Sequence, residues 1–508
     1  MRYPIGIQDF GTLRTSGHHY VDKTEQITRA TRSGKYFFLS RPRRFGKSLL
    51  ISTLAELHSG NAALFEGLWA AEYWDFAAKL RPVVWLEFSK MAYDANGLPF
   101  ELNATLAKHA EKFGVELPGP DYKTDFAALL ERIHEKTGQP VVVLVDEYDK
   151  PIIDYLDDHP RAEENRAVMK QFYGVLKPSD PHLEMVFITG VSAFAKVSIF
   201  SDLNNLKDIT LSPLATDLVG LTEAELDANF GEPLADVDRD LLREYYNGYS
   251  WTGGQPRVYN PWSILRFLDE GCRFQNFWYA TGTPTFLVKE LRRRRYTDLS
   301  GRTLNQAELT AFDFTQLDPV VVMFQTGYLT VVEYRERGNR YTLDYPNREV
   351  RESFLQGLLK VYLGSPTIPP TGSSQVWDII EALEAGDVDT VVTALNSIFA
   401  VLPYEHWNAD HEFLFHAIVH LVFTLVGVEV RSEVHTSGGR CDILVEVDGY
   451  VYAIEFKRDR PAAEALAQIE DRGYLRPYAG RKDLKRIAVG ISFETEGKRV
   501  IEYLVEER

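Results

Sequence analysis

Residues 441–457 read Cys-Asp-Ile-Leu-Val-Glu-Val-Asp-Gly-Tyr-Val-Tyr-Ala-Ile-Glu-Phe-Lys, and this stretch decides the fold of the C-terminal part of the chain. The dipeptide Asp448-Gly449 stands between two runs of alternating apolar residues, which is a strong sequence signal for a β-hairpin. Folding at this turn places Asp442 on one strand near Glu455 on the next. The pattern therefore predicts a hairpin that carries two carboxylates close together.

The carboxylates of Asp442 and Glu455 indicate a metal site. Hard cations such as Mg²⁺ take oxygen ligands and can bind through one or two carboxylates plus a substrate phosphate. Lys457 lies two residues after Glu455 and so on the same face of the strand, where its charge can orient a water and stabilise a phosphate. The alternative interpretation is an ordinary solvated sheet face, because polar and apolar residues alternate on such strands as well.

The elements around the hairpin follow in a characteristic order. They are a helix over His411–Val426, strands over Glu429–His435, Cys441–Val447 and Tyr450–Lys457, a helix over Pro461–Tyr474 and a strand over Arg486–Phe493. With the run Thr436-Ser437-Gly438-Gly439-Arg440-Cys441-Asp442 and the later Ala453-Ile454-Glu455-Phe456-Lys457, this order resembles the PD-(D/E)XK nuclease superfamily. The resemblance implies an α/β nuclease-like domain in which Asp442 and Glu455 hold Mg²⁺ or Mn²⁺, and in which they and Lys457 are catalytic.

The same resemblance implies further site residues on the flanking helices. Glu412 stands where such nucleases often carry an additional acidic metal ligand, and Asp410 competes for that role. Gln468 and Tyr474 are similar to a glutamine and a tyrosine that related nucleases use near the site. A surface amide and a half-buried tyrosine outside the site are the alternative for this pair.

A second motif lies near the N-terminus, at Gly46-Lys47-Ser48. Lys35–Ser40 is typical of a short buried strand, and Leu49–His58 has apolar residues at helical spacing. A loop between such a strand and helix presents backbone N–H groups and a helix N-terminus to phosphate. The residues expected to bind nucleotide phosphate are Arg43, Arg44, Phe45, Gly46, Lys47 and Ser48, the last through Mg²⁺. Arg41 stands where the full pattern has glycine.

The apolar run Pro140–Glu147 ends in two acids, as expected of a central parallel strand whose C-terminal end faces a nucleotide. Asp146 is then the Mg²⁺ ligand, and Glu147 polarises the attacking water. A later run places Thr189 and Ser192 at a strand end, where a hydroxyl can sense the γ-phosphate of ATP. Capping of the following turn is the alternative role for both hydroxyls.

Three segments together resemble the bacterial AAA-ATPase-like family, which commonly carries a PD-(D/E)XK domain at its C-terminus. They are residues 39–48, 145–151 and 200–206, and residues 246–249, 259–263 and 280–284 extend the likeness over essentially the whole chain. The resemblance implies a P-loop NTPase domain of the ASCE or AAA-like type, with a parallel sheet and ATP as its ligand. Arg41 in the glycine position is usual for that family.

The middle of the chain shows no catalytic cluster. Leu218–Leu268 predicts short helices, while the runs 325–334 and 340–345 predict a hairpin with helices on both sides, a winged-helix-like pattern. The run Arg292-Arg293-Arg294-Arg295 is interpreted as a solvated helix face, with a phosphate contact or an arginine finger as alternatives. The breaker-rich segment 364–374 predicts a linker. We expect an ATPase domain over 1–214, a helical lid and winged-helix-like region over 215–364, a linker over 365–375 and a nuclease-like domain over 376–508.

Composition limits the partners. The 508 residues carry a formal net charge of −17, which argues against a surface that grips nucleic acid indiscriminately and leaves only local contacts. No run approaches the roughly 18 apolar residues of a membrane span, and no signal-peptide core is seen, so we expect a cytoplasmic protein without a membrane partner. The two cysteines, Cys272 and Cys441, are too few for a disulfide framework.

The leading interpretation joins the two chemistries: ATP binding and hydrolysis control a metal-dependent nuclease that acts on DNA or RNA. The alternative is a nucleotide-dependent switch whose nuclease-like domain binds a partner or nucleic acid without cutting it. A mobile-element ATPase is a third interpretation, for which the chain shows no integrase signature. Coupling through the γ-phosphate needs a lid or a neighbouring subunit that moves, so a homo-oligomer is compatible with the first interpretation.

Overall fold

The computed structural model describes residues 2–32, 34–156, 158–192, 199–200, 203–278, 287, 291, 299–310, 318–363, 371–402, 404–425, 431–436, 439–447 and 449–508. The chain divides into two compact units. The first is Met1–Thr281 with Leu299–Arg351, and the second is Gly282–Asp298 with Glu352–Arg508. The chain therefore passes between the units at 281/282, 298/299 and 351/352.

A five-stranded parallel sheet forms the centre of the N-terminal part of the first unit. Its strands are β1 (Tyr36–Ser40), β2 (Val83–Glu87), β3 (Val141–Asp146), β4 (Leu183–Gly190) and β5 (Lys207–Asp208), in the order β2-β3-β4-β1-β5. All residues of β1 and β3 are buried, as expected for strands covered on both faces. Strand β4 lies between β1 and β3, so residues at its end stand between the loop after β1 and the acids after β3.

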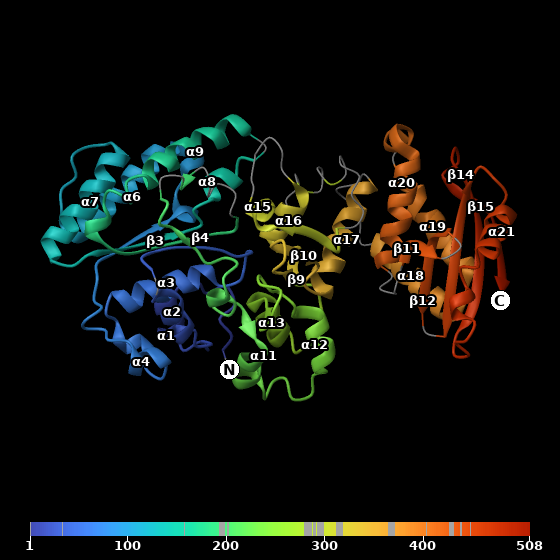
Figure 1. The fold of residues 1–508 in the computed structure, drawn as a ribbon, viewed down its shortest axis with the longest axis horizontal. Helices are drawn as coiled ribbons and strands as arrows, with labels where there is room; N and C mark the ends of the chain where they lie inside the picture. The colour runs from blue at the N-terminus through green and yellow to red at the C-terminus, as the bar shows by residue number, and fades with distance from the viewer. Residues whose placement is uncertain are drawn as a thin grey trace. The chain divides into compact units, whose positions relative to one another are not determined.

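Helices cover this sheet on both sides. They are α1 (Phe10–Thr15), α2 (Thr24–Thr31), α3 (Lys47–His58), α4 (Trp69–Tyr73), α5 (Tyr93–Asn96), α6 (Leu98–Phe113), α7 (Tyr122–Thr137), α8 (Lys150–Ile153) and α9 (His159–Tyr173). In Figure 1, α6, α7 and α9 lie on one side of β3 and β4, and α1 to α4 lie on the other. Helix α3 packs on β2, β3 and β4, which fixes the direction in which its N-terminus points.

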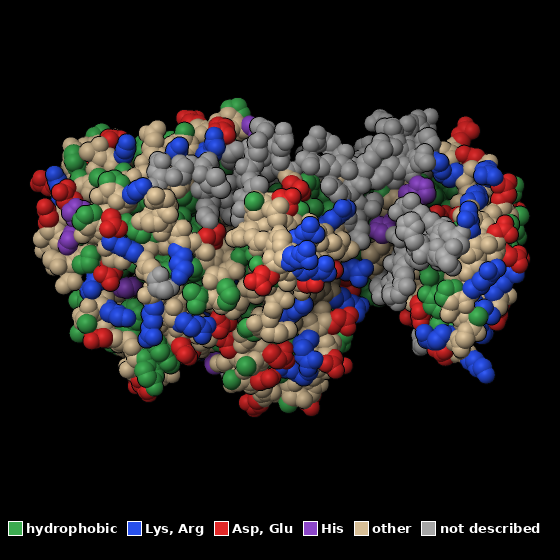
Figure 2. All heavy atoms as spheres, in the orientation of Figure 1, with side chains coloured by type: hydrophobic (Ala, Val, Ile, Leu, Met, Phe, Trp, Pro, Cys, Tyr) green, Lys and Arg blue, Asp and Glu red, His purple; other side chains and the backbone are tan. Residues whose placement is uncertain are grey.

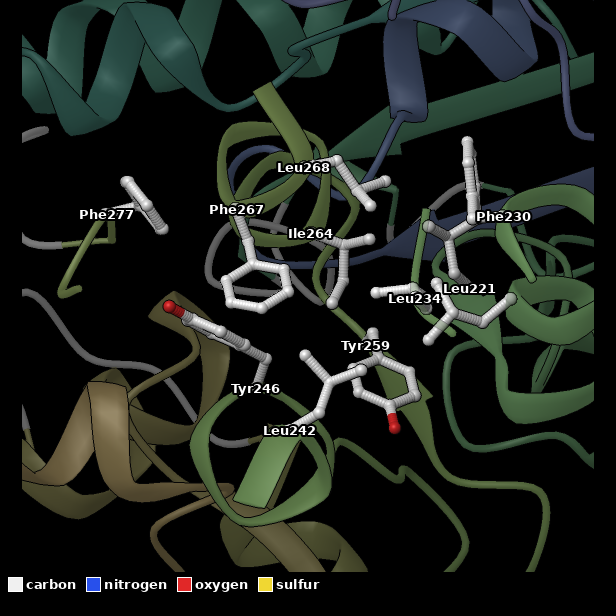
Figure 3. Close-up of a cluster of buried hydrophobic side chains, with 11 residues drawn as sticks. Leu221, Phe230, Leu234, Leu242, Tyr246, Tyr259, Ile264, Phe267, Leu268 and Phe277 are labelled. Carbon is white, nitrogen blue, oxygen red and sulfur yellow. The ribbon is translucent and has the colours of Figure 1, made fainter. Parts of the chain in front are cut away.

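Short helices follow the sheet, as the sequence predicts. They are α11 (Glu223–Phe230), α12 (Arg239–Tyr246) and α13 (Pro261–Asp269), and a short antiparallel pair, β6 (Leu221–Thr222) and β7 (Val258–Tyr259), ties them together. Their apolar sides meet in one cluster that includes Leu242, Tyr246, Tyr259, Ile264 and Phe267 (Figure 3). The pair β6–β7 is absent from the sequence prediction because two-residue strands leave no periodic pattern.

The predicted hairpin is present, with a later start. Its strands are β9 (Thr330–Arg335) and β10 (Arg340–Asp344), joined by β8 (Arg302–Asn305) in a sheet of order β8-β10-β9, with α15 (Gln306–Thr310) and α16 (Pro319–Thr326) between β8 and β9. Gln325 and Thr326 were predicted in the strand but end α16, which Gly327 closes at φ 91°. The strand–helix–helix–hairpin order and the sheet are those of the winged-helix-like pattern. Helix α17 (Arg348–Tyr362) follows.

The second unit contains a five-stranded mixed sheet. Helices α18 (Thr371–Ala385), α19 (Val388–Ala400) and α20 (Tyr404–Leu425) precede strands β11 (Arg431–Thr436), β12 (Gly439–Val447) and β13 (Tyr450–Arg458), then helix α21 (Ala462–Arg472) and strands β14 (Lys485–Glu494) and β15 (Arg499–Glu507). The strands lie in sequence order, and only β13 and β14 are parallel. A parallel pair needs a crossover, which α21 supplies. Strand β15 is an element that the sequence analysis did not predict.

The period of two along each strand sorts the residues of this sheet onto two faces. Ala453 and Ala488 pack with α21 residues such as Leu466, so that face is covered by α21. Phe456 and Phe493 contact Phe415 of α20 on the opposite face. Because Glu455 and Lys457 have the parity of Ala453, they face α21.

Several predicted features lie outside the described residues. These are the basic run 292–295, the segment 280–284, residues 364–370 of the predicted linker, and the side chains of Asp410, Glu412 and Cys441. Helix α18 begins at Thr371, inside the segment that was interpreted as a linker. Over the described part of the chain, no helix combines the length and apolar character needed to cross a membrane. Figure 2 shows acidic and basic side chains interspersed over the face in view.

Candidate functional site

Asp442 and Glu455 lie side by side on the hairpin, as predicted. The pair Ile443–Ile454 is in register between the antiparallel strands β12 and β13, and Asp442 precedes Ile443 while Glu455 follows Ile454, so the two acids lie at the next position along the hairpin. The amide of Asp442 donates to Glu455 Oε2 at 3.3 Å, and the amide of Phe456 donates to Asp442 Oδ2 at 2.9 Å. Backbone amides beside the end of the antiparallel ladder therefore hold the two carboxylates together.

Lys457 and Gln468 complete this group. Lys457 Nζ donates to Glu455 Oε1 at 3.3 Å and to Gln468 Oε1 at 2.6 Å. The Gln468 amide donates in turn to Glu455 Oε1 and to the hydroxyl of Tyr474, the latter at 3.4 Å. The residues Asp442, Glu455, Lys457, Gln468 and Tyr474 form one hydrogen-bonded cluster, which we call the carboxylate cluster.

Helix α21 reaches the cluster because Gly490 lets it approach the sheet. Gly490 pairs with Glu455 in the register of β13 and β14. A Cβ atom at Gly490 would lie 2.5 Å from the Ala462 carbonyl oxygen and 2.8 Å from the Leu466 amide. Glu502 of β15 accepts the amide of Ala462 at 3.0 Å and so stabilises the first turn of the helix. The position of Gln468 thus depends on contacts far from it in sequence.

The electrostatics of the cluster fit a divalent cation. Burial, and then the neighbouring charge of Asp442, raise the pKa of Glu455 to about 7, while Lys457 lowers it. Glu455 is only 3% exposed. Two adjacent carboxylates in a poorly solvated place repel each other, and a cation bound by their oxygens relieves that repulsion. The donor set of Asp442 and Glu455 therefore suits Mg²⁺ or Mn²⁺.

The loop after β1 has the form expected of a phosphate-binding loop. Gly46 caps α3 at φ 91°, a conformation that favours glycine, and the free N–H groups of the first turn of α3 follow. Lys47 is buried, and its Nζ donates to the carbonyls of Arg41 and Pro42 at 2.9 Å each. Burial lowers the pKa of Lys47, and the charges of Asp146, Asp149 and Glu147 oppose this effect.

The other predicted loop residues differ in what their side chains contact. Ser48 lies in the first turn of α3, and the Arg43 side chain is exposed. The Phe45 ring packs edge-on against Tyr249 and Trp251, so only the backbone of Phe45 can serve the loop.

Asp146 and Thr189 meet at the adjacent ends of β3 and β4. The Thr189 hydroxyl donates to Asp146 Oδ1 at 2.8 Å, and both residues are buried. Glu147 follows at φ 54°, an uncommon conformation for a side-chain-bearing residue that turns the chain sharply away from β3. Burial and the charge of Asp146 raise the pKa of Glu147. Two acids and a hydroxyl thus occur at the strand ends where the sequence predicted them.

Asp149 is a residue that sequence reasoning missed. Its carboxylate accepts the amides of Val191 and Ser192 and, at 2.6 Å, the Ser192 hydroxyl. The close approach needs Gly190, because a Cβ there would lie 2.7 Å from Asp149 Oδ1. The Ser192 hydroxyl, which was predicted to sense the γ-phosphate, donates to Asp149 in this structure. The sequence motif Asp146-Glu147-Tyr148-Asp149 could have drawn attention to Asp149, but the motif does not indicate what this last acid does.

Arg41 has a structural role. Its guanidinium donates to the carbonyls of Ser40, Thr210 and Ala215 at 2.8 Å each, and it stacks over the ring of Trp251 at 3.8 Å. Burial lowers the pKa of Arg41 to about 9. The residue thus ties the start of the phosphate loop to segments far along the chain.

An apolar cavity of about 100 Å³ opens beside Gly46. Leu49 and Leu50 of α3 line one side of it, and Tyr20, Val21, Leu221 and Leu265 line others. The cavity thus lies directly beside the loop that is expected to bind phosphate.

Together these features define a P-loop ATPase-type domain joined to a PD-(D/E)XK nuclease-type domain. Residues 4–200 match the family model described as "Predicted AAA-ATPase", and residues 410–503 match that of the PD-(D/E)XK nuclease superfamily. A protein of Azotobacter chroococcum mcd 1, described as "Uncharacterized protein in vnfD 5'region", is 38% identical over 517 residues, which cover 99% of each chain. The chain belongs to the bacterial AAA-ATPase-like family that carries a C-terminal PD-(D/E)XK domain.

Proposed function

We propose that this protein binds and hydrolyses ATP in its N-terminal domain and thereby controls a metal-dependent nuclease in its C-terminal domain. The observation that carries the nuclease assignment is the carboxylate cluster, in which Asp442, Glu455 and Lys457 converge. The proposed division of labour is an ATPase domain over 1–214, a lid and winged-helix-like region over 215–364, a linker over 365–375 and a nuclease domain over 376–508. The substrate is nucleic acid.

Asp442 and Glu455 would hold the cation, with Glu412 as a proposed additional ligand. A bound Mg²⁺ or Mn²⁺ supplies charge stabilisation for a phosphate and a more acidic water. Lys457, fixed by Gln468 Oε1, keeps a positive charge beside Glu455, where a substrate phosphate would lie. Burial of Glu455 strengthens these electrostatic interactions because water does not screen them.

In the ATPase domain, the backbone of residues 43–47 and the start of α3 would receive the phosphates, and Lys47 would turn from the loop carbonyls toward them. Ser48 and Asp146 would hold Mg²⁺, which would supply positive charge to offset the charge of the phosphates. Glu147 would orient the attacking water, with Thr189 and Ser192 near the γ-phosphate. The apolar cavity beside Gly46 would receive the adenine ring.

Cleavage is tested with purified full-length protein on single- and double-stranded DNA and RNA, with Mg²⁺ or Mn²⁺ and with or without ATP. Asp442→Asn and Lys457→Met should each reduce cleavage by about 100-fold or more, the usual cost of losing a catalytic group. Asp483→Asn, which removes an exposed carboxylate of the same unit, is the matched control. Cleavage that persists in the first two variants would contradict the site; no cleavage under any condition would favour the switch that binds without cutting.

Nucleotide binding is tested by calorimetry with ATP. Lys47→Ala should weaken ATP binding by about tenfold or more, because the loop loses its buried cation. Lys177→Ala, at an exposed lysine of the same domain, should leave affinity unchanged. If Lys47→Ala binds ATP as tightly as the unaltered protein does, the assignment of the phosphate-binding loop is wrong.

A further inference from the structure

Glu349 is a buried carboxylate that binds two distant parts of the chain. It lies in the first turn of α17 and is 1% exposed. Glu349 Oε1 accepts the amides of Phe277 and Trp278 at 2.6 and 2.8 Å, and Oε2 accepts the Ser263 hydroxyl at 2.7 Å. This one side chain therefore fixes the segment after α13 against the start of α17.

Both of these segments lead out of the first unit. Trp278 precedes the crossing at 281/282 by three residues, and Glu349 precedes the crossing at 351/352 by two. The later turns of α17 belong to the second unit, which contains the carboxylate cluster. The contacts of Glu349 therefore lie within a few residues of two of the three crossings.

The phosphate loop contributes a positive charge, Arg44, that acts on Glu349. Arg44 has φ 68° in that loop, and its guanidinium stacks over the ring of Trp262 at 4.0 Å, next to Ser263. Its positive charge lowers the pKa of Glu349, against burial, which raises it to about 7. Arg44 and Glu349 form no direct ion pair, and Arg44 Nη1 is buried without a hydrogen-bond partner among the described residues. An unpaired guanidinium N–H in a phosphate loop is a donor suited to a phosphate oxygen.

We propose that Arg44 and Glu349 form a switch that transmits occupancy of the phosphate loop to the two segments that lead into the C-terminal unit. This rests on the proposed nucleotide binding. A phosphate at the loop draws the Arg44 guanidinium away from its place over the Trp262 ring. When Arg44 moves toward the phosphate, Glu349 loses its neighbouring cation. The strength of the hydrogen bonds that hold Phe277 and Trp278 to the start of α17 then changes. The coupling works equally in reverse, so that a change at α17 alters nucleotide affinity.

Glu349→Gln isolates the charge from the hydrogen bonds. The glutamine oxygen can accept the amides of Phe277 and Trp278, and its amide can donate to Ser263, so the packing is retained. Only the negative charge facing Arg44 is lost. Glu270→Gln removes an exposed carboxylate of the same region and is the matched control. Trp262→Leu, which removes the ring beneath Arg44, is an independent variant that leaves Glu349 unchanged.

The measurement is amide hydrogen exchange of the full chain with and without a saturating non-hydrolysable ATP analogue, beside calorimetric affinities. In the unaltered protein and in Glu270→Gln, the analogue should change exchange by about fivefold in peptides that contain Trp278 and in residues 352–362. In Glu349→Gln the analogue should bind equally or more tightly, yet that response should be lost. In Trp262→Leu the response should fall to about half or less.

Three results would overturn the switch while leaving the proposed function intact: binding without any exchange change in the unaltered protein, a full response in Glu349→Gln, or a loss of affinity of about tenfold in that variant. A full response in Trp262→Leu would equally exclude Arg44 as the moving part. An unaltered protein that binds no nucleotide would instead refute the proposed function, and the switch with it.

Discussion

The amide of Asp442 donates to the carboxylate of Glu455 at 3.3 Å, across the two strands of the hairpin. A part-buried backbone donor thus fixes one acid beside the other, and the charge of Asp442 adds to burial in raising the pKa of Glu455 to about 7. Burial and the charge of Asp442 therefore make the metal-free protein sensitive to pH, although the hydrogen bond from the Asp442 amide by itself lowers the pKa of Glu455.

Glu455→Gln should stabilise the metal-free protein at high pH more than at low pH. The folded-state pKa of Glu455 lies above its ordinary value of 4.5, so the folded state binds more protons between about pH 4.5 and 7, and stability falls as pH rises through that window. Glutamine does not titrate. The gain in unfolding free energy from Glu455→Gln should be larger at pH 8 than at pH 5 by about 1–3 kcal/mol. Urea unfolding in EDTA measures it; an equal gain at both pH values would contradict the raised pKa.

Binding of Mg²⁺ at pH 7 should release protons from Glu455. With a pKa of about 7 this carboxyl is partly protonated at neutral pH, and a cation requires its ionised form. Calorimetric titrations in two buffers of different ionisation enthalpy should show a release of about half a proton, which Glu455→Gln should abolish. Release that is unchanged in the variant would assign the proton to another group.

Gly490→Ala should weaken both the fold and the carboxylate cluster. The added Cβ would lie 2.5 Å from the Ala462 carbonyl oxygen, so α21 has to move away from β14 and carries Gln468 with it. Overpacking of this kind costs about 1–3 kcal/mol. Chemical unfolding and cleavage rate measure the two effects. Gly480→Ala, where a Cβ meets nothing within 4 Å, should change neither.

Arg41→Gly restores the glycine of the general phosphate-loop pattern, and it should nevertheless harm this protein. The carbonyls of Thr210 and Ala215 would lose their donor, and a large cavity would open under Trp251. The relief of a buried charge offsets only part of this loss, so we expect destabilisation of about 2–4 kcal/mol. Thermal unfolding tests this prediction, and Arg43→Gly, a change at an exposed residue, is the control. An unchanged melting temperature would show that Arg41 is dispensable.

Asp149→Ala should destabilise the ATPase domain, and Asp149→Asn should do so much less. Alanine leaves the buried amides of Val191 and Ser192 without an acceptor, at a cost of about 1–3 kcal/mol, whereas asparagine can place its oxygen at the Oδ2 position that receives both. Unfolding curves and ATP hydrolysis rates of the two variants should follow this order. Equal behaviour of both variants would show that the negative charge, and not the acceptor, matters.

Much of the fold could be predicted because its signals are local. Alternating apolar residues around Asp448-Gly449 predicted the hairpin, and the run that ends in Asp146-Glu147 predicted β3. The family relationship confirmed both domains. Elements of two residues, such as β6 and β7, and the edge strand β15 were missed because they show little periodicity. The start of the strand at Thr330 was predicted too early because a valine-rich helix precedes it.

The sequence by itself determined the two motifs, since the residue types at the hairpin and at the loop after β1 are set by short-range spacing. Only the tertiary structure decided which distant side chains complete them. Gln468 reaches Glu455 through the helix that Gly490 admits, Asp149 holds the end of β4, and Glu349 joins segments more than seventy residues apart. The physical reason is that turns and periodicity are encoded by neighbours along the chain, whereas a buried polar group takes whichever partner the packing of the whole unit brings to it.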